Sequence, residues 1–332
     1  MRRSTFVAAV GGLAAGVAQM TGASALTSLP IGTSRDPNNG ALLIVAKGKN
    51  YFRDNGLDVS LKYFPSAGDL VSAMASGALN IGSGGSVPTT TLRASGYQAV
   101  VLAQQADISN AQEIVVQKTI VTPKDFEGKK LGCNFGTVSE MMADTVLRRY
   151  GVPADKVALV NLGPADMVTA LLRGDIAGAC LWEPWCSQAV KGGAHRLVSG
   201  SESYIPGQSG PVSLLGDHGL LIASKAWVDA NGPTVAAVLK SLVAAQQFIA
   251  KQPDAAAQIV GAELNVPAAE MKGLVARNRY SMAIDAKLIR DMNAEAAFLR
   301  GAGKLKNPVT AADWVYTGPL EKIDAKLVQW RA

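Results

Sequence analysis

Four short polar or glycine-rich segments contain residue types that could bind a small anion. They are Thr33-Ser34-Arg35, Ser83-Gly84-Gly85-Ser86, Gly136-Thr137-Val138-Ser139 and Trp182-Glu183-Pro184-Trp185. Each follows an apolar run that is typical of a strand, and the second and third also precede helical patterns. The first turn of a helix offers unpaired N–H groups and partial positive charge, which attract anions. In open α/β sheets ligands bind at the carboxyl ends of the strands, so these segments predict a small-molecule site.

Several residues in the first three segments have two interpretations. Arg35 could pair two oxygens of a sulfonate or carboxylate, or it is a solvated loop residue. Gly85 either lets a ligand approach the main chain or only permits a tight turn, and we expect the hydroxyl and N–H of Ser86 to face the ligand. Thr137 or Ser139 would cap the following helix, which is compatible with anion binding. The remaining candidates in these or equivalent loops are Ser34, Ser66 and Gly136.

Two acidic residues could instead receive a positive group on the ligand. Glu183 follows a strand-like run, and Asp217 stands just before the apolar run Gly219–Ser224. Trp182 could stack on a ligand or wall it off. His218 is either a ligand contact or, as is more usual for a lone histidine, a structural hydrogen-bonding residue.

An internal repeat indicates which elements position these residues. The segment Asp69–Leu79, with the sequence Asp-Leu-Val-Ser-Ala-Met-Ala-Ser-Gly-Ala-Leu, recurs as Asp166–Ile176, with the sequence Asp-Met-Val-Thr-Ala-Leu-Leu-Arg-Gly-Asp-Ile. In both copies a glycine turn and a strand pattern precede the helix, and a glycine and another strand pattern follow it. The repeat predicts two matching βαβαβ units, and therefore two lobes with a ligand cleft between them.

Alternating strand and helix patterns favour parallel sheets that are flanked by helices on both faces. We therefore expect an α/β protein of two lobes, the first from residues 26–117 and 219–332, the second from residues 118–218. The first sheet is expected to include a strand near Glu113–Val116. A polar loop is expected over residues 33–40, followed by a helix over Ala41–Phe52.

The N-terminal segment has the pattern of a secretory signal peptide. Arg2 and Arg3 precede an apolar stretch from Phe6 to about Ala18, and Ala23-Ser24-Ala25 fits a cleavage site. A membrane anchor would need about 20 apolar residues, whereas this stretch is shorter and rich in glycine. The arginine pair leaves the twin-arginine export route open. We expect cleavage near Ala25, no further segment that could span a membrane, and a soluble protein in the periplasm.

Composition and motifs exclude several other functions. The chain of 332 residues carries a formal charge of +6, but its lysines and arginines are scattered, whereas nucleic-acid binding favours a clustered basic stripe. No phosphate-binding loop, nucleophile elbow or zinc-ligand spacing occurs, so we expect neither a cofactor nor a metal. The cysteines Cys133, Cys180 and Cys186 cannot all pair with one another. They are either buried thiols or include one bridge, Cys180–Cys186 or Cys133–Cys180.

Five longer segments together carry a resemblance to a known family. They are Asn80–Pro88, Val116–Ile120, Asp125–Leu131, Val157–Pro164 and Leu171–Pro184. On these segments the chain resembles the periplasmic substrate-binding proteins of ABC importers for taurine, alkanesulfonates and nitrate, and it is most similar to the taurine and alkanesulfonate branch. The resemblance covers nearly all of the chain after the expected cleavage site.

The resemblance implies a two-lobed type II binding-protein fold with two crossovers between the lobes. It also implies a monomer that closes on a small anionic ligand by a hinge motion and delivers it to the membrane permease, without catalysis. A sulfonate or taurine-like ligand is expected. Nitrate, pyrimidine precursors and other aromatic or carboxylate ligands stay open, as does an enzyme that resembles the pyrimidine synthases of thiamine metabolism.

Overall fold

The computed structural model describes Met1 and residues 25–331 as two β-sheets flanked by helices. The expected signal peptide therefore lies outside the described residues, apart from Met1 and Ala25. The first sheet contains β1 (Thr27–Ser34), β2 (Leu57–Phe64), β3 (Ile81–Gly85), β4 (Ala99–Asp107), β12 (His218–Ser224) and β13 (Arg279–Tyr280). The second contains β5 (Gln112–Val116), β6 (Lys130–Cys133), β7 (Ala158–Asn161), β8 (Gly178–Trp182), β9 (His195–Ser199), β10 (Glu202–Ser203) and β11 (Gly210–Pro211).

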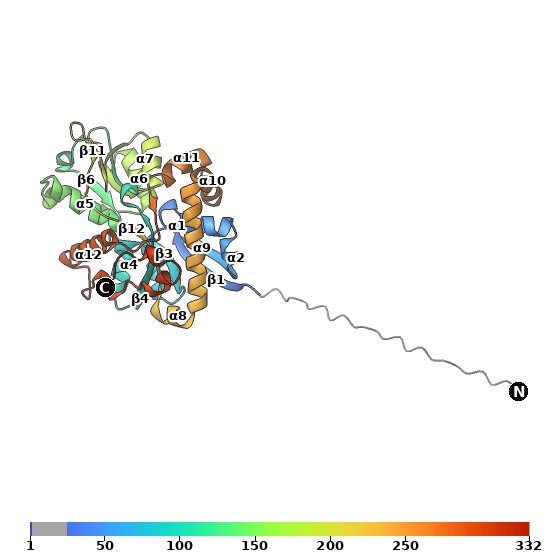
Figure 1. Cartoon of the computed structure of the whole chain (residues 1–332). Coiled ribbons are helices and arrows are strands. Elements are labelled where there is room, and N and C mark those ends of the chain that lie inside the picture. The colour runs from blue at the N-terminus through green and yellow to red at the C-terminus, as the bar shows by residue number, and fades with distance from the viewer. Residues whose placement is uncertain (2–24, 332) are drawn as a thin grey trace.

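Helices cover both sheets, and the expected α/β class with two helix-flanked lobes is confirmed (Figure 1). The helices are α1 (Pro37–Gly48), α2 (Tyr51–Asp54), α3 (Ala67–Ala75), α4 (Ser86–Ala94), α5 (Val138–Arg149), α6 (Pro164–Arg173), α7 (Trp185–Lys191), α8 (Lys225–Ala230), α9 (Gly232–Lys251), α10 (Pro253–Leu264), α11 (Ala268–Val275), α12 (Ala286–Gly301) and α13 (Gly318–Glu321). We call the first sheet with its helices lobe 1, and the second sheet with its helices lobe 2. In Figure 1 the labelled elements β6, α5, α6 and α7 gather at one end of the molecule, and β1, β3, β4 and α8 gather at the other.

The sequence repeat corresponds to a repeat in topology. The first sheet has the order β13-β4-β12-β3-β1-β2, and the second ends in β5-β8-β6-β7. In each lobe a parallel trio, β2-β1-β3 or β7-β6-β8, is extended by an antiparallel strand beside its third member. The repeated helices α3 and α6 connect the equivalent strands, which confirms the two matching βαβαβ units.

The two repeat helices pack on their sheets through equivalent glycines. A Cβ at Gly32 in β1 would lie 2.4 Å from a methyl group of Leu70, and a Cβ at Gly132 in β6 would lie 2.8 Å from Ile176 and 3.2 Å from Met167. Leu70 and Met167 occupy the same position of the repeated segment. Because both glycines lack a Cβ, α3 and α6 can approach their sheets closely, and this places the helix starts near the strand ends.

The first expected boundary between the lobes needs a correction. The strand over Glu113–Val116 was expected in the first sheet, but β5 pairs antiparallel with β8 and β9 in the second. The chain therefore crosses between the sheets at residues 108–111, and it returns just before β12. The main chains of the two crossings meet, because Ile108 N donates to Asp217 O at 2.9 Å.

The first helix begins earlier than expected. The polar segment at residues 33–40 is the end of β1 and the start of α1, not a loop. Asp36 is extended and its carboxylate accepts from Asn39 N at 2.9 Å, while Pro37 takes the first helical position. An acidic N-cap followed by proline is a recognisable helix start, so the Asp36-Pro37 pair is the local sequence signal for this earlier start.

One helix of the described residues, α9, is long and apolar enough to cross a membrane. The expectation that no segment beyond the N-terminal stretch meets this test is therefore wrong. The residues buried along α9 include Val238, Leu242 and Ala245, and they join the core of lobe 1. A helix with one face in the core of a soluble protein has this composition as well.

All three cysteines are buried free thiols in the structure. Burial raises the pKa of Cys133 to about 12 and also raises the pKa of Cys180 and Cys186, so the reactive thiolate is scarce at neutral pH. We expect a thiol-reactive dye to label the native protein slowly and to count three thiols after denaturation. A count of one after denaturation would show that a bridge forms.

Candidate ligand-binding site

A cavity between the lobes lies at the carboxyl ends of β1, β3 and β8. Its empty volume is about 400 Å³, which includes space open to solvent. Its walls are formed by Ser34, Asp36, Asn38, Asn39, Ser66, Ala67, Gly85, Pro88, Ile108, Gln112, Thr137, Val138, Trp182 and Asp217. These residues come from both lobes and from both crossings, which is the arrangement expected of a ligand site in a cleft between two lobes.

The two lobes also touch one another through side chains. Asn38 Nδ2 in lobe 1 donates to the main-chain oxygen of Glu183 in lobe 2 at 3.0 Å. Lys191 of α7 pairs with Glu270 of α11 at 2.6 Å, and Lys304 pairs with Glu140 of α5. These contacts link the two lobes.

Four helices begin at the cavity: α1, α3, α4 and α5. Carboxylates that line the cavity already lie at two of these N-termini. Asp36 caps α1, and Asp217 lies beside the first residue of α4, where its Oδ1 is 3.1 Å from the hydroxyl of Ser86. The starts of α3 and α5 are capped by the hydroxyls of Ser66 and Thr137. Asp69 and Glu140 lie in the first turns of these helices but are not among the residues that line the cavity, so on the cavity side these two N-termini are the better anion sites.

Burial changes the protonation of both cavity carboxyl groups. Asp36 is 4% exposed and Asp217 is 1% exposed. Desolvation raises the pKa of Asp36 to about 6 and that of Asp217 to about 7, although hydrogen bonds to each carboxylate oppose the rise. A cation in the cavity would favour the ionised forms of both groups, and of the two only Asp217 has an unpartnered oxygen among the described residues.

Unpartnered polar atoms in the cavity wall are mostly acceptors. Within the described residues, Asn39 Oδ1, Gln112 Oε1, Asp217 Oδ2 and the Ser34 hydroxyl are buried and have no hydrogen-bond partner. Buried polar atoms are normally paired, and an orphaned one costs about 1–3 kcal/mol. No Lys, Arg or His side chain is among the described residues that line the cavity. A ligand that donates hydrogen bonds would pair such acceptors.

The rest of the wall is apolar. Trp182 ends β8, is 8% exposed, and pairs across the sheet with Gln112 of β5. Pro88, Ile108 and Val138 add further apolar surface. A ligand with a short hydrocarbon part would be in contact with these groups.

The structure brings half of the residues expected from the sequence to the cavity. Those that line it are Ser34, Ser66, Gly85, Thr137, Trp182 and Asp217. Those that do not are Arg35, Ser86, Gly136, Ser139, Glu183 and His218. The cavity is also lined by Asp36, Asn38, Asn39 and Gln112. The sequence did not indicate these residues, because its patterns predict a loop over residues 33–40 and a strand near Glu113–Val116 in the first sheet.

Ser86 does not face the ligand space, contrary to expectation. It is fully buried, and its Oγ lies 2.5 Å from Glu295 Oε1 and 3.1 Å from Asp217 Oδ1. Ser139 is likewise turned inward, because its hydroxyl donates to Cys180 O at 2.6 Å and accepts from Asn134 N. Both serines hold wall elements together instead of presenting a hydroxyl to a ligand.

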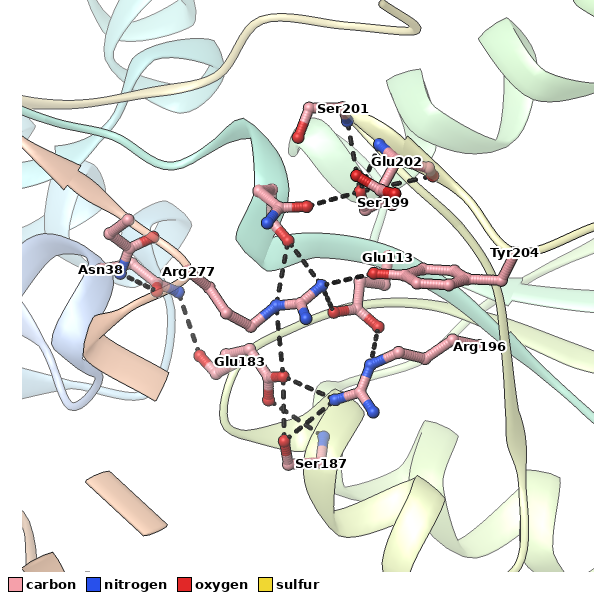
Figure 2. Close-up of polar contacts among 12 residues, drawn as sticks. Asn38, Glu113, Glu183, Ser187, Arg196, Ser199, Ser201, Glu202, Tyr204 and Arg277 are labelled. Atoms are coloured by element: carbon pink, nitrogen blue, oxygen red, sulfur yellow. Dashed lines mark hydrogen bonds and ion pairs between the residues drawn. The ribbon is translucent and has the colours of Figure 1, made fainter. Parts of the chain in front are cut away.

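Glu183 is not available as a partner for a ligand amine, which corrects that expectation. Figure 2 shows its carboxylate among Ser187, Arg196 and Arg277. Arg196 lies 3.0 Å from Glu183 Oε1, Ser187 Oγ donates to the same oxygen at 2.9 Å, and the Glu183 side chain is 0% exposed. The negative charge of Glu183 is therefore balanced inside the protein.

The other three expected residues, Arg35, His218 and Gly136, also lie outside the cavity lining. Arg35 is exposed and its guanidinium lies 5.5 Å from the ring centre of Tyr63. His218 is buried and its Nε2 is 2.9 Å from Asp291. Gly136 has a φ of +77° in the turn before α5. The expected pairing of Arg35 with an anionic group is thus not supported by the position of its side chain.

Comparison with known proteins places the chain in a family. Residues 38–256 match the family described as NMT1/THI5 like. The chain belongs to the NMT1/THI5-like family. One relative, the taurine-binding periplasmic protein of Escherichia coli K12, is 30% identical over 284 residues, which cover 81% of this chain and 85% of that protein.

The proteins similar to this chain differ in their described activities. The 4-amino-5-hydroxymethyl-2-methylpyrimidine phosphate synthase of Aspergillus parasiticus is 24% identical over 226 residues, which cover 65% of this chain and 64% of that enzyme. Among solved structures, the alkanesulfonate-binding protein SsuA of Xanthomonas axonopodis pv. citri bound to MOPS has a TM-score of 0.73 at 20% identity, with coverage of 89% and 100%. The structural likeness supports the fold that is described above.

Proposed function

We propose that this protein is the periplasmic solute-binding component of an ABC importer, and that its ligand is a small aminosulfonate of the taurine type. One observation carries the choice of a zwitterion over a simple anion. The cavity presents two buried carboxyl groups and orphaned acceptors, yet also two hydroxyl-capped helix N-termini that favour an anionic group. Similarity to the taurine-binding relative supports the same ligand class.

In this proposal the sulfonate lies between the starts of α3 and α5, one from each lobe. Ala67 and Val138 are the first helical residues there and both line the cavity. Main-chain N–H groups of these first helical turns supply the hydrogen bonds, because the Thr137 hydroxyl already donates to Asn134 O at 2.8 Å. Because these donors come from opposite lobes, a ligand that reaches both stabilises the closed arrangement.

The ammonium group lies at the other side of the cavity. Asp217 Oδ2, Asn39 Oδ1 and Gln112 Oε1 are three acceptors without partners in the described chain, and an ammonium group has three hydrogens to donate. The short hydrocarbon part contacts Trp182 and its apolar neighbours. This arrangement satisfies the acceptors that the protein alone leaves unpaired.

The proposed function also includes export of the protein, docking on a permease and hinge bending between the lobes. We propose export with a leader cleaved near Ala25, and a monomer that docks on the membrane permease. Hinge bending is proposed at residues 108–111 and at the return before β12, so that β5 moves with lobe 2. No catalysis is proposed, since the described residues that line the cavity include no histidine or cysteine, and the His218 ring bonds to Asp291.

Calorimetry with matched ligands tests this function. The panel is taurine, ethanesulfonate, which lacks only the amine, ethylamine, β-alanine, nitrate and bicarbonate. We expect taurine to bind about 100-fold more tightly than ethanesulfonate, since a buried charge-assisted contact contributes roughly 1.5–3 kcal/mol. Equal affinity for taurine and ethanesulfonate would contradict the zwitterion site, and binding of nitrate or bicarbonate alone would contradict the ligand class.

A further inference from the structure

Three buried side chains behind the cavity wall, those of Ser86, Asp217 and Glu295, form a hydrogen-bonded group. The hydroxyl of Ser86 alone cannot supply a hydrogen to both carboxyl groups. Ser86 Oγ lies 2.5 Å from Glu295 Oε1 and 3.1 Å from Asp217 Oδ1, and it accepts from His218 N at 3.1 Å. A serine hydroxyl has one hydrogen. If both carboxyl groups were ionised, the Ser86 hydroxyl could donate to only one of them. The carboxylate oxygen of the other would then contact Ser86 Oγ with no hydrogen between the two oxygens. One of the two carboxyl groups must therefore carry a proton.

The surroundings indicate that the protonated group is Glu295. Its side chain on α12 is 0% exposed, and its Oε2 has no partner among the described residues. An ionised carboxylate in that position would lose nearly all of its solvation with one hydrogen bond in return. Asp217 is better placed for the charge, because its Oδ1 accepts from His218 N at 3.0 Å and it lies at the start of α4.

The nearby charged groups do not neutralise a second carboxylate. Lys287 of α12 is 2.7 Å from Asp291 and 3.1 Å from Asp107 of β4, so two acids share its charge. The ring of His218 contacts Asp291 on that same side, and Arg290 is 3.9 Å from Asp291. Desolvation and the negative charge of Asp217 raise the pKa of Glu295 well above its ordinary value, in agreement with the geometry.

We propose that Glu295 is a neutral positioning residue for the ligand amine: its carboxylic acid donates to Ser86, and Ser86 donates to Asp217. The chain of two hydrogen bonds leaves Asp217 as the one ionised group, with Oδ2 free for the ammonium of the ligand. The inference rests on the proposed function for its ligand, but the proton on Glu295 is a property of the free protein.

This arrangement makes the binding of an amine depend on pH. Asp217 in the free protein has a pKa of about 7, and a bound ammonium group lowers it. Below that pKa, binding must release a proton, so the affinity for taurine falls as the pH falls. Ethanesulfonate gains nothing from the charge of Asp217, and its affinity does not fall with pH in the same way.

Infrared spectroscopy of the free protein tests the proton directly. At about pH 8, above the Asp217 pKa of about 7, we expect a carboxylic-acid carbonyl band that disappears in Glu295→Gln. The absence of such a band in the wild type, or its persistence in the variant, would overturn the proposal. Because no ligand is present, this result is independent of whether the protein binds taurine.

Affinity measurements test the positioning role. Glu295→Leu removes the donor to Ser86, and we expect taurine to bind about tenfold more weakly while ethanesulfonate is unchanged within about twofold, the effect of one lost hydrogen bond. Glu295→Gln keeps an N–H donor and restores taurine binding. Ser86→Ala removes a hydrogen bond that lowers the Asp217 pKa, so the pH midpoint of taurine binding moves upward. A loss in Glu295→Gln as large as in Glu295→Leu would show that Glu295 itself is the ionised group.

Discussion

Asp217→Asn is expected to weaken taurine binding about 100-fold and to leave ethanesulfonate binding within about threefold of the wild type, since loss of one partner of a buried charge pair costs roughly 2–5 kcal/mol. The substitution keeps the oxygen that accepts from His218 N. It replaces the unpartnered Oδ2 with an NH₂ group. Both this NH₂ group and the ligand ammonium are hydrogen-bond donors, so they cannot bond to each other. Isothermal titration of both ligands at the same pH measures the difference.

Asp36→Asn is the matched control for this variant. Asp36 also lines the cavity, but its carboxylate caps α1 and neither of its oxygens is among the unpartnered atoms of the described chain. Asparagine caps a helix about as well as aspartate, so we expect a loss of less than about fivefold. Equal losses in the two variants would mean that the cavity attracts the amine by its overall charge and not through Asp217.

Arg277→Met is expected to lower the free energy of unfolding by about 3–5 kcal/mol, the usual effect of removing one partner from a buried charge cluster. Arg277 follows α11 in lobe 1 and reaches into lobe 2 (Figure 2). There it contacts the Glu113 carboxylate, donates to Asn110 O at 2.9 Å and donates to Tyr204 Oη at 3.2 Å. Glu113 and Glu183 are both 0% exposed.

The reason lies in the charge balance of the cluster. Two buried glutamates, Glu113 and Glu183, face two arginines, Arg277 and Arg196, and Arg196 Nε is 2.7 Å from Glu113. Removal of Arg277 leaves one negative charge without compensation in a site from which water is largely excluded. For a chain of this size the loss corresponds to a melting temperature lower by roughly 5–8 °C, which differential scanning calorimetry would detect.

The double variant Arg277→Met with Glu113→Gln separates charge from packing. It leaves Glu183 paired with Arg196 alone, so the cluster is again neutral, and we expect it to recover at least about 1 kcal/mol relative to Arg277→Met. Arg279→Met is the surface control, because Arg279 is 58% exposed and 3.7 Å from Asp107. It is expected to change stability by less than about 0.5 kcal/mol. A double variant less stable than Arg277→Met would contradict the charge argument.

Local sequence signals predicted the architecture well and the site partly. The helix start at Thr137 and the glycine Gly85 at the end of β3 were recognisable because caps and turns depend on a few neighbouring residues. The same signal existed at Asp36-Pro37 but was not used, so the start of α1 and its residues Asn38 and Asn39 were missed. Gln112 carried no local signal, since nothing in a strand reveals which sheet it joins.

The sequence by itself determined that the protein has two similar α/β lobes. This follows from the repeat of Asp69–Leu79 as Asp166–Ile176, because the spacing of apolar residues within each copy indicates its helix and strand. Only the tertiary structure decided the charge state and direction of the polar side chains. Glu183 and Asp217 are both acidic residues near strand ends, yet two arginines neutralise Glu183 while Asp217 keeps an unpartnered oxygen in the cavity wall. The difference depends on Arg196, Arg277 and Glu295, which are distant in sequence, and burial makes the energies of such contacts large.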